Sequence, residues 1–192
     1  MKKFLGIIGL ISLLLGCASL PERYAEEATK TLESQEGQIR VVFLSEEELL
    51  KRFGRTENPY VNYPGKFPPR NFVVFEAILE SGGEELFVKI PEITLALGEA
   101  EGEAFTERRL KSVWNFYYKD DKRANLLLQD KVDEGIPHIS EISVMPGEVA
   151  TFLLVFLEEY PVDGNGVLRM PLVIGGETGT IEFEYDFKAL DE

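Results

Sequence analysis

Apolar and polar residues alternate with a period of two over much of the last third of the chain, which is the pattern of strands with one buried face. In the final stretch acidic residues separate apolar ones that occupy every second position. The apolar residues are Ile181, Phe183, Tyr185 and Phe187. The same pattern predicts strands at 139–145, 149–157 and 167–174, and we expect the first two to form a hairpin around Pro146-Gly147.

The first half of the chain also carries strand patterns. Residues 39–44 predict a first strand, and the apolar run 72–79, interrupted by Glu76 alone, predicts a central strand covered on both faces. Residues 81–84 are typical of a hairpin turn, and 86–97 predict one strand that breaks at Pro91.

Two regions carry helix signals. Ser45 and Glu48 have the spacing of a capping box, which predicts a short helix ending at Gly54. Residues 105–134 allow two interpretations. Thr106 can cap a helix with apolar residues at helical spacing, or strand formers on either side of Asp120-Asp121 can form a hairpin. The helical spacing favours the first, and the hairpin stays open as the alternative.

Lys2 and Lys3 followed by the apolar run 4–15 have the pattern of a signal peptide, because the run is too short to span a bilayer. Leu14-Leu15-Gly16-Cys17 resembles the lipobox of bacterial lipoproteins. The resemblance implies cleavage before Cys17, a diacylglyceryl group on its sulfur, and export to the cell envelope. Ala18 follows the cysteine in place of an inner-membrane retention aspartate, which implies the outer membrane, with the face left open.

We therefore expect a signal peptide at 1–16, a lipidated cysteine and tether at 17–37, and a single domain at 38–192. The strands predict a mainly β fold, an antiparallel sandwich with short helices before it and inserted within it. Within 71–187, the segment 142–148 leading into 152–156 is similar to a feature of immunoglobulin-like domains of bacterial lipoproteins, in which a proline-glycine-acid turn precedes an apolar strand. That resemblance implies an immunoglobulin-like sandwich.

Composition narrows the choice of partners. The chain has 34 acidic and 20 basic side chains, and the net charge moves from −14 to −16 when Lys2 and Lys3 are removed. Such acidity excludes nucleic acid as an expected partner, because phosphates require a basic surface. An acidic surface is also not attracted to an anionic membrane, so we expect the acyl chains on Cys17 to be the membrane contact. Because Cys17 is the only cysteine, the domain has no disulfide.

Candidate chemistry is sparse. The one histidine, His138, follows Pro137, and the sequence has no nucleophile-elbow motif and no cluster of cysteines and histidines for a transition metal. We therefore expect a protein that is not an enzyme and has no cofactor and no metal site. The alternative is a carbohydrate-processing enzyme that uses paired carboxylates, for which Glu158-Glu159 is the candidate pair.

The proline-rich segment 55–70 is the candidate binding site, since loops longer than about 12–15 residues are often functional. Its aromatic and basic side chains predict contact with an envelope protein or glycan: Arg55, Tyr60, Tyr63, Lys66, Phe67 and Arg70. The other interpretation is that the aromatic residues fasten a structural loop over the sandwich. The expected function is a lipid-anchored bacterial envelope protein that binds or scaffolds a partner without catalysis.

Overall fold

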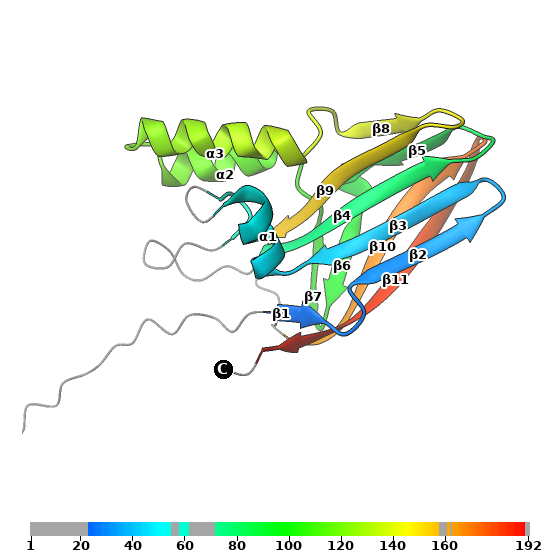
Figure 1. Ribbon diagram of the computed structural model, residues 1–192, viewed down its shortest axis with the longest axis horizontal. Helices are drawn as coiled ribbons and strands as arrows, with labels where there is room; N and C mark the ends of the chain where they lie inside the picture. The colour runs from blue at the N-terminus through cyan, green and yellow to red at the C-terminus, as the bar shows by residue number, and fades with distance from the viewer. Residues whose placement is uncertain (1–22, 55–57, 62–71, 158–160, 162, 191–192) are drawn as a thin grey trace, which may run out of the picture.

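A computed structural model describes residues 23–54, 58–61, 72–157, 161 and 163–190, and Figure 1 shows two sheets packed face to face with helices at one end. The seven-stranded sheet consists of β1 (Arg23–Ala25), β5 (Leu86–Lys89), β6 (Thr94–Leu97), β7 (Ala100–Glu103), β8 (Glu141–Val144), β10 (Gly164–Ile174) and β11 (Glu177–Ala189). The four-stranded sheet consists of β2 (Thr29–Ser34), β3 (Gly37–Leu44), β4 (Phe72–Ser81) and β9 (Val149–Leu157). The helices are α1 (Glu46–Phe53), α2 (Glu107–Tyr117), α3 (Lys122–Gly135) and the 3-10 turn η1 (Ile90–Glu92).

All strand pairs are antiparallel, so the chain is mainly β and its arrangement is consistent with a β-sandwich, as the sequence predicts. The smaller sheet has the order β2-β3-β4-β9. In the larger sheet the order is β1-β11-β10-β5-β8, with β6 pairing with both β10 and β7. The η1 turn at Pro91 separates β5 from β6, and both pair with β10, which confirms the predicted broken strand.

The main core lies between the two sheets. The alternation predicted for β11 is confirmed, because Phe183, Tyr185 and Phe187 are buried while Glu182 and Glu184 are exposed. The hydroxyl of Tyr185 crosses the core and donates to the carbonyl oxygen of Val41 on β3 at 3.1 Å. Burial raises the pKa of Tyr185, so this hydroxyl stays protonated and joins the two sheets.

β4 is covered on both faces, as predicted. Consecutive residues Val73, Val74 and Phe75 are all fully buried, which requires apolar layers on either side of the strand. The second layer lies on the outer face of the four-stranded sheet and consists of α1, residues 58–61, α2 and α3. The polar residue of the run, Glu76, pairs with Arg52 of α1 at 2.6 Å.

Two predicted hairpins are wrong. β4 pairs with β3 and β9, whereas β5 pairs with β10 and β8, so residues 81–85 carry the chain from one sheet to the other. Pro146-Gly147 likewise joins β8 to β9, which lie in different sheets. Turn residues are the same for a hairpin and for a crossing, since they report local backbone conformation and not the pairing partner.

The predicted tether at 17–37 and the domain start at 38 also need correction, because residues 23–37 belong to the sandwich. Arg23 of β1 pairs with Ala189 of β11, and β2 pairs with β3 over its whole length. β2 lies at a sheet edge and nearly all its side chains are exposed, so it lacks the apolar alternation that signals a strand. Residues 17–22 lie outside the described residues.

The helical interpretation of 105–134 is confirmed, and the alternative hairpin is wrong. Thr106 accepts the backbone N–H of Arg109 at the start of α2, and Asp121 accepts that of Ala124 at the start of α3. The capping box that starts α1 is also present, with both reciprocal bonds between Ser45 and Glu48. α1 ends at Gly54, whose φ of 82° suits glycine.

Candidate functional site

Tyr60 is part of the second core and is not a binding residue on the surface, so this part of the predicted site is wrong. Its side chain is 1% exposed, and its ring packs on Phe53 with 4.7 Å between ring centroids. Its hydroxyl donates to the carbonyl oxygen of Lys131 on α3 at 3.1 Å, and burial raises its pKa. The adjacent Asn58, also fully buried, donates to the carbonyl oxygens of Leu49 and Gly54. The aromatic residue therefore fastens this segment onto the sandwich.

The remaining candidates for partner binding lie outside the described residues: Arg55, Tyr63, Lys66, Phe67 and Arg70. The same holds for Cys17 and for the candidate carboxylate pair Glu158-Glu159. Their predicted roles stay predictions.

His138 meets two carboxylates at the base of the helical hairpin. Its Nδ1 lies 2.7 Å from Glu107 Oε2 and 3.8 Å from Asp133 Oδ1. These three side chains bring metal-ligand atoms within 4.8 Å of one another, which the spacing in the sequence did not predict. Lys111, however, binds both carboxylates and offsets part of their negative charge. A cation would have to displace its ammonium group, so the arrangement is better suited to structure than to metal binding.

This cluster ties α2, α3 and the segment after α3 together. The Lys111 ammonium, helped by His138, holds the pKa of Glu107 below its ordinary range. Burial opposes the charge on Lys111, but its hydrogen bonds to Asp133 and Glu107 outweigh that effect and raise its pKa. At neutral pH Glu107 and Lys111 are therefore both charged, and ion pairs hold the base of the hairpin together.

At the opposite end of the sandwich, four turns are joined by backbone hydrogen bonds, and we call this the distal end. Gly82 donates to the carbonyl oxygen of Glu36 at 2.7 Å and links the β4–β5 turn to the β2–β3 turn. The Ser81 carbonyl accepts from Gly147, and the Glu85 carbonyl accepts from Gly175, at 2.9 and 3.1 Å. Segments far apart in sequence thus form one continuous rim, visible where the strands meet their turns in Figure 1.

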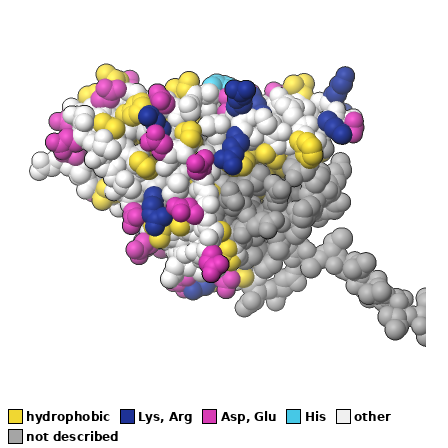
Figure 2. All heavy atoms as spheres, turned by 180° about the vertical axis from the view of Figure 1, so that it is seen from behind, with side chains coloured by type: hydrophobic (Ala, Val, Ile, Leu, Met, Phe, Trp, Pro, Cys, Tyr) yellow, Lys and Arg dark blue, Asp and Glu magenta, His cyan; other side chains and the backbone are white. Residues whose placement is uncertain are grey.

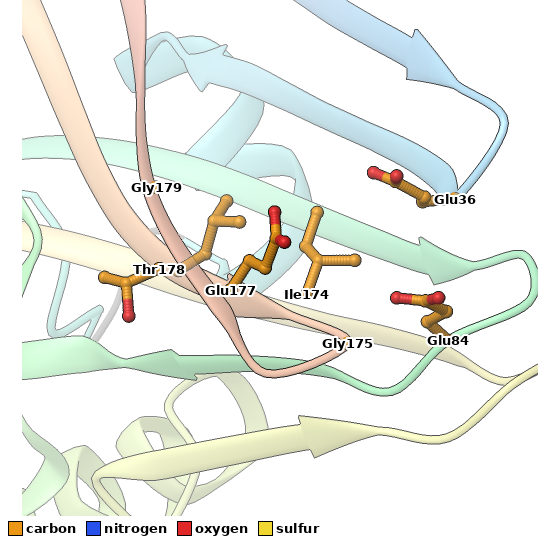
Figure 3. A pocket seen from close by; sticks show the side chains of 8 residues that line it. Glu36, Glu84, Ile174, Gly175, Glu177, Thr178 and Gly179 are labelled. Atoms are coloured by element: carbon orange, nitrogen blue, oxygen red, sulfur yellow. The ribbon is translucent and has the colours of Figure 1, made fainter.

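The distal end contains a cavity of about 390 Å³ that we call the acidic hollow. Eight residues line it: Glu36, Glu84, Leu172, Ile174, Gly175, Glu177, Thr178 and Gly179. Figure 3 shows the carboxylates of Glu36, Glu84 and Glu177 converging on one space from three different turns, with Ile174 between them. None of the eight is basic, so these carboxylates give the hollow a negative potential.

Gly175 is required for this geometry. Its φ of 57° lies in the left-handed region, and a Cβ at this position would lie 1.6 Å from Glu84 Oε2. The Glu84 carboxylate therefore occupies the space that any other residue at 175 would fill.

Sequence reasoning missed the hollow, although a local signal exists. Each of its three glutamates adjoins a turn that contains glycine: Glu36-Gly37, Gly83-Glu84 and Gly176-Glu177. Such dipeptides are common in turns, and only the sheet topology brings these three turns to the same end.

No family model, curated protein or solved structure matches the chain. Among the helices in the described part of the chain, none is both long and apolar enough to cross a membrane. Any function must therefore be argued from the lipobox pattern and from the geometry of the site.

Proposed function

We propose that the chain is a lipid-anchored protein of the bacterial cell envelope. Its acidic hollow, at the distal end, binds a partner without catalysis. The anchor would be the acyl chains on Cys17, and the outer membrane is the proposed location because Ala18 follows that cysteine. For the fold, we propose that residues 71–187 are related to the immunoglobulin-like domains of bacterial lipoproteins. Support comes from the two antiparallel sheets and from the turn at Pro146-Gly147, which leads into the apolar strand β9.

The observation that carries this proposal is the position of the hollow relative to the start of the sandwich. Arg23, which opens β1, pairs with Ala189 at the end of β11, while the hollow lies at the other end of the same strand, beside Glu177. A 13-residue strand spans about 43 Å at roughly 3.3 Å per residue. If Cys17 holds the chain at a bilayer, the hollow therefore points away from that bilayer and is accessible to a partner.

The chemistry of the hollow favours a cationic ligand group. Three carboxylates around apolar Leu172 and Ile174 suit a lysine or arginine side chain, whose charged head would meet the acids while its methylene stem covers the apolar floor. Two exposed apolar side chains at the distal end, Met145 and Val149, extend the contact area beyond the hollow. The proposed partner is thus an envelope protein with a basic surface.

The anchor is tested by Cys17→Ser. The variant should accumulate as an unprocessed precursor and take up no labelled fatty acid, since the lipid requires the cysteine sulfur. Fatty acid label that persists in the variant would overturn the anchoring proposal.

The binding site is tested by a triple Glu36→Gln, Glu84→Gln, Glu177→Gln variant in a crosslinking pull-down from cell envelopes. Capture of the partner should fall, and what remains should lose its dependence on salt, because the charges that salt screens are gone. Glu184→Gln is the matched control, since Glu184 is exposed on the outer face of β11, away from the hollow. Equal capture by the triple variant and the wild type would overturn the assignment of the hollow.

The glutamates of the hollow also bear on the alternative function, a carbohydrate-processing enzyme with paired carboxylates, because they share one concave space. The lining favours binding over that function, since none of the eight residues is aromatic and so none can stack on a sugar ring. Release of reducing ends from envelope glycans, lost in the triple glutamine variant, would favour the enzyme instead.

A further inference from the structure

The tip of the α2–α3 hairpin carries exposed apolar and basic side chains, which differs from the rest of this acidic protein. Phe116 is 73% exposed and Leu126 is 61% exposed, although both are large and apolar. Three basic residues lie between them along the chain and are also exposed: Lys119, Lys122 and Arg123. In Figure 2, basic side chains stand among apolar ones at the helical end, while acidic side chains gather toward the opposite end.

The two apolar side chains lie on the same side of the hairpin. Asn115 of α2 and Asn125 of α3 face each other, with 2.7 Å between Oδ1 and Nδ2. Phe116 and Leu126 each follow one of these residues, and one step along either of two antiparallel helices turns the side chain by about 100° to the same side. Trp114, one step the other way, is buried against the sandwich, so Phe116 and Leu126 face away from it.

The hairpin that presents this surface is fixed in place. Gln129 donates to Asn115 at 2.8 Å and to Asn125 at 3.0 Å, so the helices are joined near the tip. At the base, Lys111 binds Glu107 and Asp133 across the same pair of helices. A surface already ordered in the free protein loses little conformational entropy when it binds.

The tip lies at the end of the molecule where the described chain begins. In Figure 1 the hairpin projects from the upper edge of the sandwich, and β1 and the end of β11 lie along its lower edge, all on the side away from the distal turns. From Cys17 to Arg23 the chain advances six residues, which span at most about 20–22 Å when fully extended. α3, with 14 residues, is about 21 Å long at 1.5 Å per residue. The segment from Cys17 to Arg23 and the hairpin are therefore of similar length, so the hairpin tip can reach a bilayer that holds Cys17.

We propose that the tip of the α2–α3 hairpin rests on the anionic surface of the bilayer that holds Cys17, with Phe116 and Leu126 among the acyl-chain boundary and Lys119, Lys122 and Arg123 on phospholipid phosphates. This inference rests on the proposed lipid anchor. Exposed apolar residues flanked by lysine and arginine are the composition of helices that lie in the membrane interface.

Charge explains why this contact would orient the domain. The acidic domain as a whole is repelled by an anionic bilayer, so the basic tip is the face that approaches it most closely while the acidic distal end turns away. Asp120 and Asp121 also lie in the tip, so its three basic and two acidic side chains leave a net charge of +1, against the negative charge of the chain as a whole. The contact would add a second attachment point to the lipid, which fixes the direction in which the acidic hollow faces.

The test uses the full lipidated chain in vesicles of phosphatidylethanolamine and phosphatidylglycerol. Because Cys17 is the only cysteine and carries the lipid, Leu126→Cys supplies a single free thiol for an environment-sensitive dye. We expect the emission of this label to rise and shift to the blue, and to be quenched by nitroxide lipids. The matched control is Thr178→Cys at the acidic hollow, whose label should keep the spectrum of a dye in water.

Reversing the three tip charges, with Lys119→Glu, Lys122→Glu and Arg123→Glu, should abolish the shift. Acidic residues are favourable in the first turn of α3, where Lys122 and Arg123 lie, but not at position 119, which follows the C-terminal end of α2. Thermal unfolding of the variant is therefore measured alongside, and the double variant Lys122→Glu, Arg123→Glu serves as the second test if the triple variant is destabilised. Protein that floats with vesicles while both labels report water would overturn the inference but leave the anchor intact. Protein that fails to float and carries no fatty acid would overturn the anchor, and the placement of the tip with it. A shift seen in whole envelopes but absent from vesicles would assign the tip to a protein partner instead.

Discussion

The hydroxyl of Tyr60 donates to the backbone carbonyl of Lys131, 71 positions along the chain, with 3.1 Å between oxygen atoms. Lys131 in turn donates its ammonium group to the carbonyl oxygen of Phe53 at 2.7 Å, next to the ring on which Tyr60 packs. Residues 58–61, the described part of the proline-rich segment, are therefore locked between α1 and α3. Tyr60 should thus matter for stability and not for direct partner contact.

Replacing this tyrosine should destabilise the domain in two steps. Tyr60→Phe removes the hydroxyl and leaves the Lys131 carbonyl without that donor, which should cost about 1–2 kcal/mol of unfolding free energy. Tyr60→Ala also removes the buried ring and should cost roughly 3–5 kcal/mol. Urea unfolding followed by circular dichroism measures both. If Tyr60→Ala unfolds at the wild-type urea concentration, the side chain is not packed as described.

The alternation in β11 allows a paired test of the main core. Phe183 is buried between the sheets, so Phe183→Ala should lower the unfolding free energy by roughly 3–5 kcal/mol. Glu184, the next residue, points to solvent, and Glu184→Ala should change it by about 0.5 kcal/mol or less. Thermal and urea unfolding of the two variants are the measurements. Equal losses would contradict the register of the strand.

Strands with a strong apolar pattern could be predicted from the sequence, and strands without one could not. β11 could be predicted from its alternating apolar residues and β4 from its continuous apolar run, because the environment of each strand dictates which positions are apolar. β2 is an edge strand with few buried side chains, so nothing in its composition distinguishes it from a tether. The helices of 105–134 could be predicted because the cap Thr106 and the helical spacing of the apolar residues act locally, whereas Asp121, which caps α3, also suited the turn of the alternative hairpin.

The candidate site was harder to predict, because it depends on contacts between distant segments. Tyr60 has the sequence context of an exposed loop residue, and only the packing of α3 against α1 buries it. Conversely, Glu36, Glu84 and Glu177 lie at three ordinary turns. They share a cavity only because one turn crosses between the sheets and the other two join neighbouring strands at the same end. Residue type and spacing along the chain carry no information about such contacts between distant segments.

The ion pairs at the base of the hairpin should make stability depend on acidity. The pKa of Glu107 is held below its ordinary value of 4.5, so folding favours the deprotonated carboxyl. Its contribution to the unfolding free energy is complete above about pH 4.5 and is lost as the pH falls through the lower value in the folded state. Glu107→Gln should therefore lose stability at neutral pH and show a weaker decline in acid. Urea unfolding at about pH 7, 5, 4 and 3 measures this. Parallel declines in the two proteins would show that Glu107 is not the group responsible.

Two adjacent glycines separate backbone strain from the geometry of the acidic hollow. Gly175 and Gly176 have φ values of 57° and 89°, so alanine at either position should cost about 1–2 kcal/mol of strain. A Cβ at 176 meets nothing within 4 Å, whereas a Cβ at 175 would lie 1.6 Å from the Glu84 carboxylate and force that side chain out of the hollow.

We therefore expect Gly175→Ala and Gly176→Ala to lower the unfolding free energy by similar amounts, because Glu84 is exposed and can turn away at little cost. They should differ in function. Gly175→Ala should reduce partner capture in the crosslinking pull-down, because it displaces one of the three carboxylates that the triple glutamine variant removes. Gly176→Ala should capture normally once the temperature is lowered to offset its reduced stability. Adding Glu84→Ala to Gly175→Ala should then cause no further loss of capture, because the displaced carboxylate no longer takes part. Equal capture by both glycine variants would mean that the position of Glu84 in the hollow is irrelevant to binding, and the remaining acids of the distal rim would have to carry it.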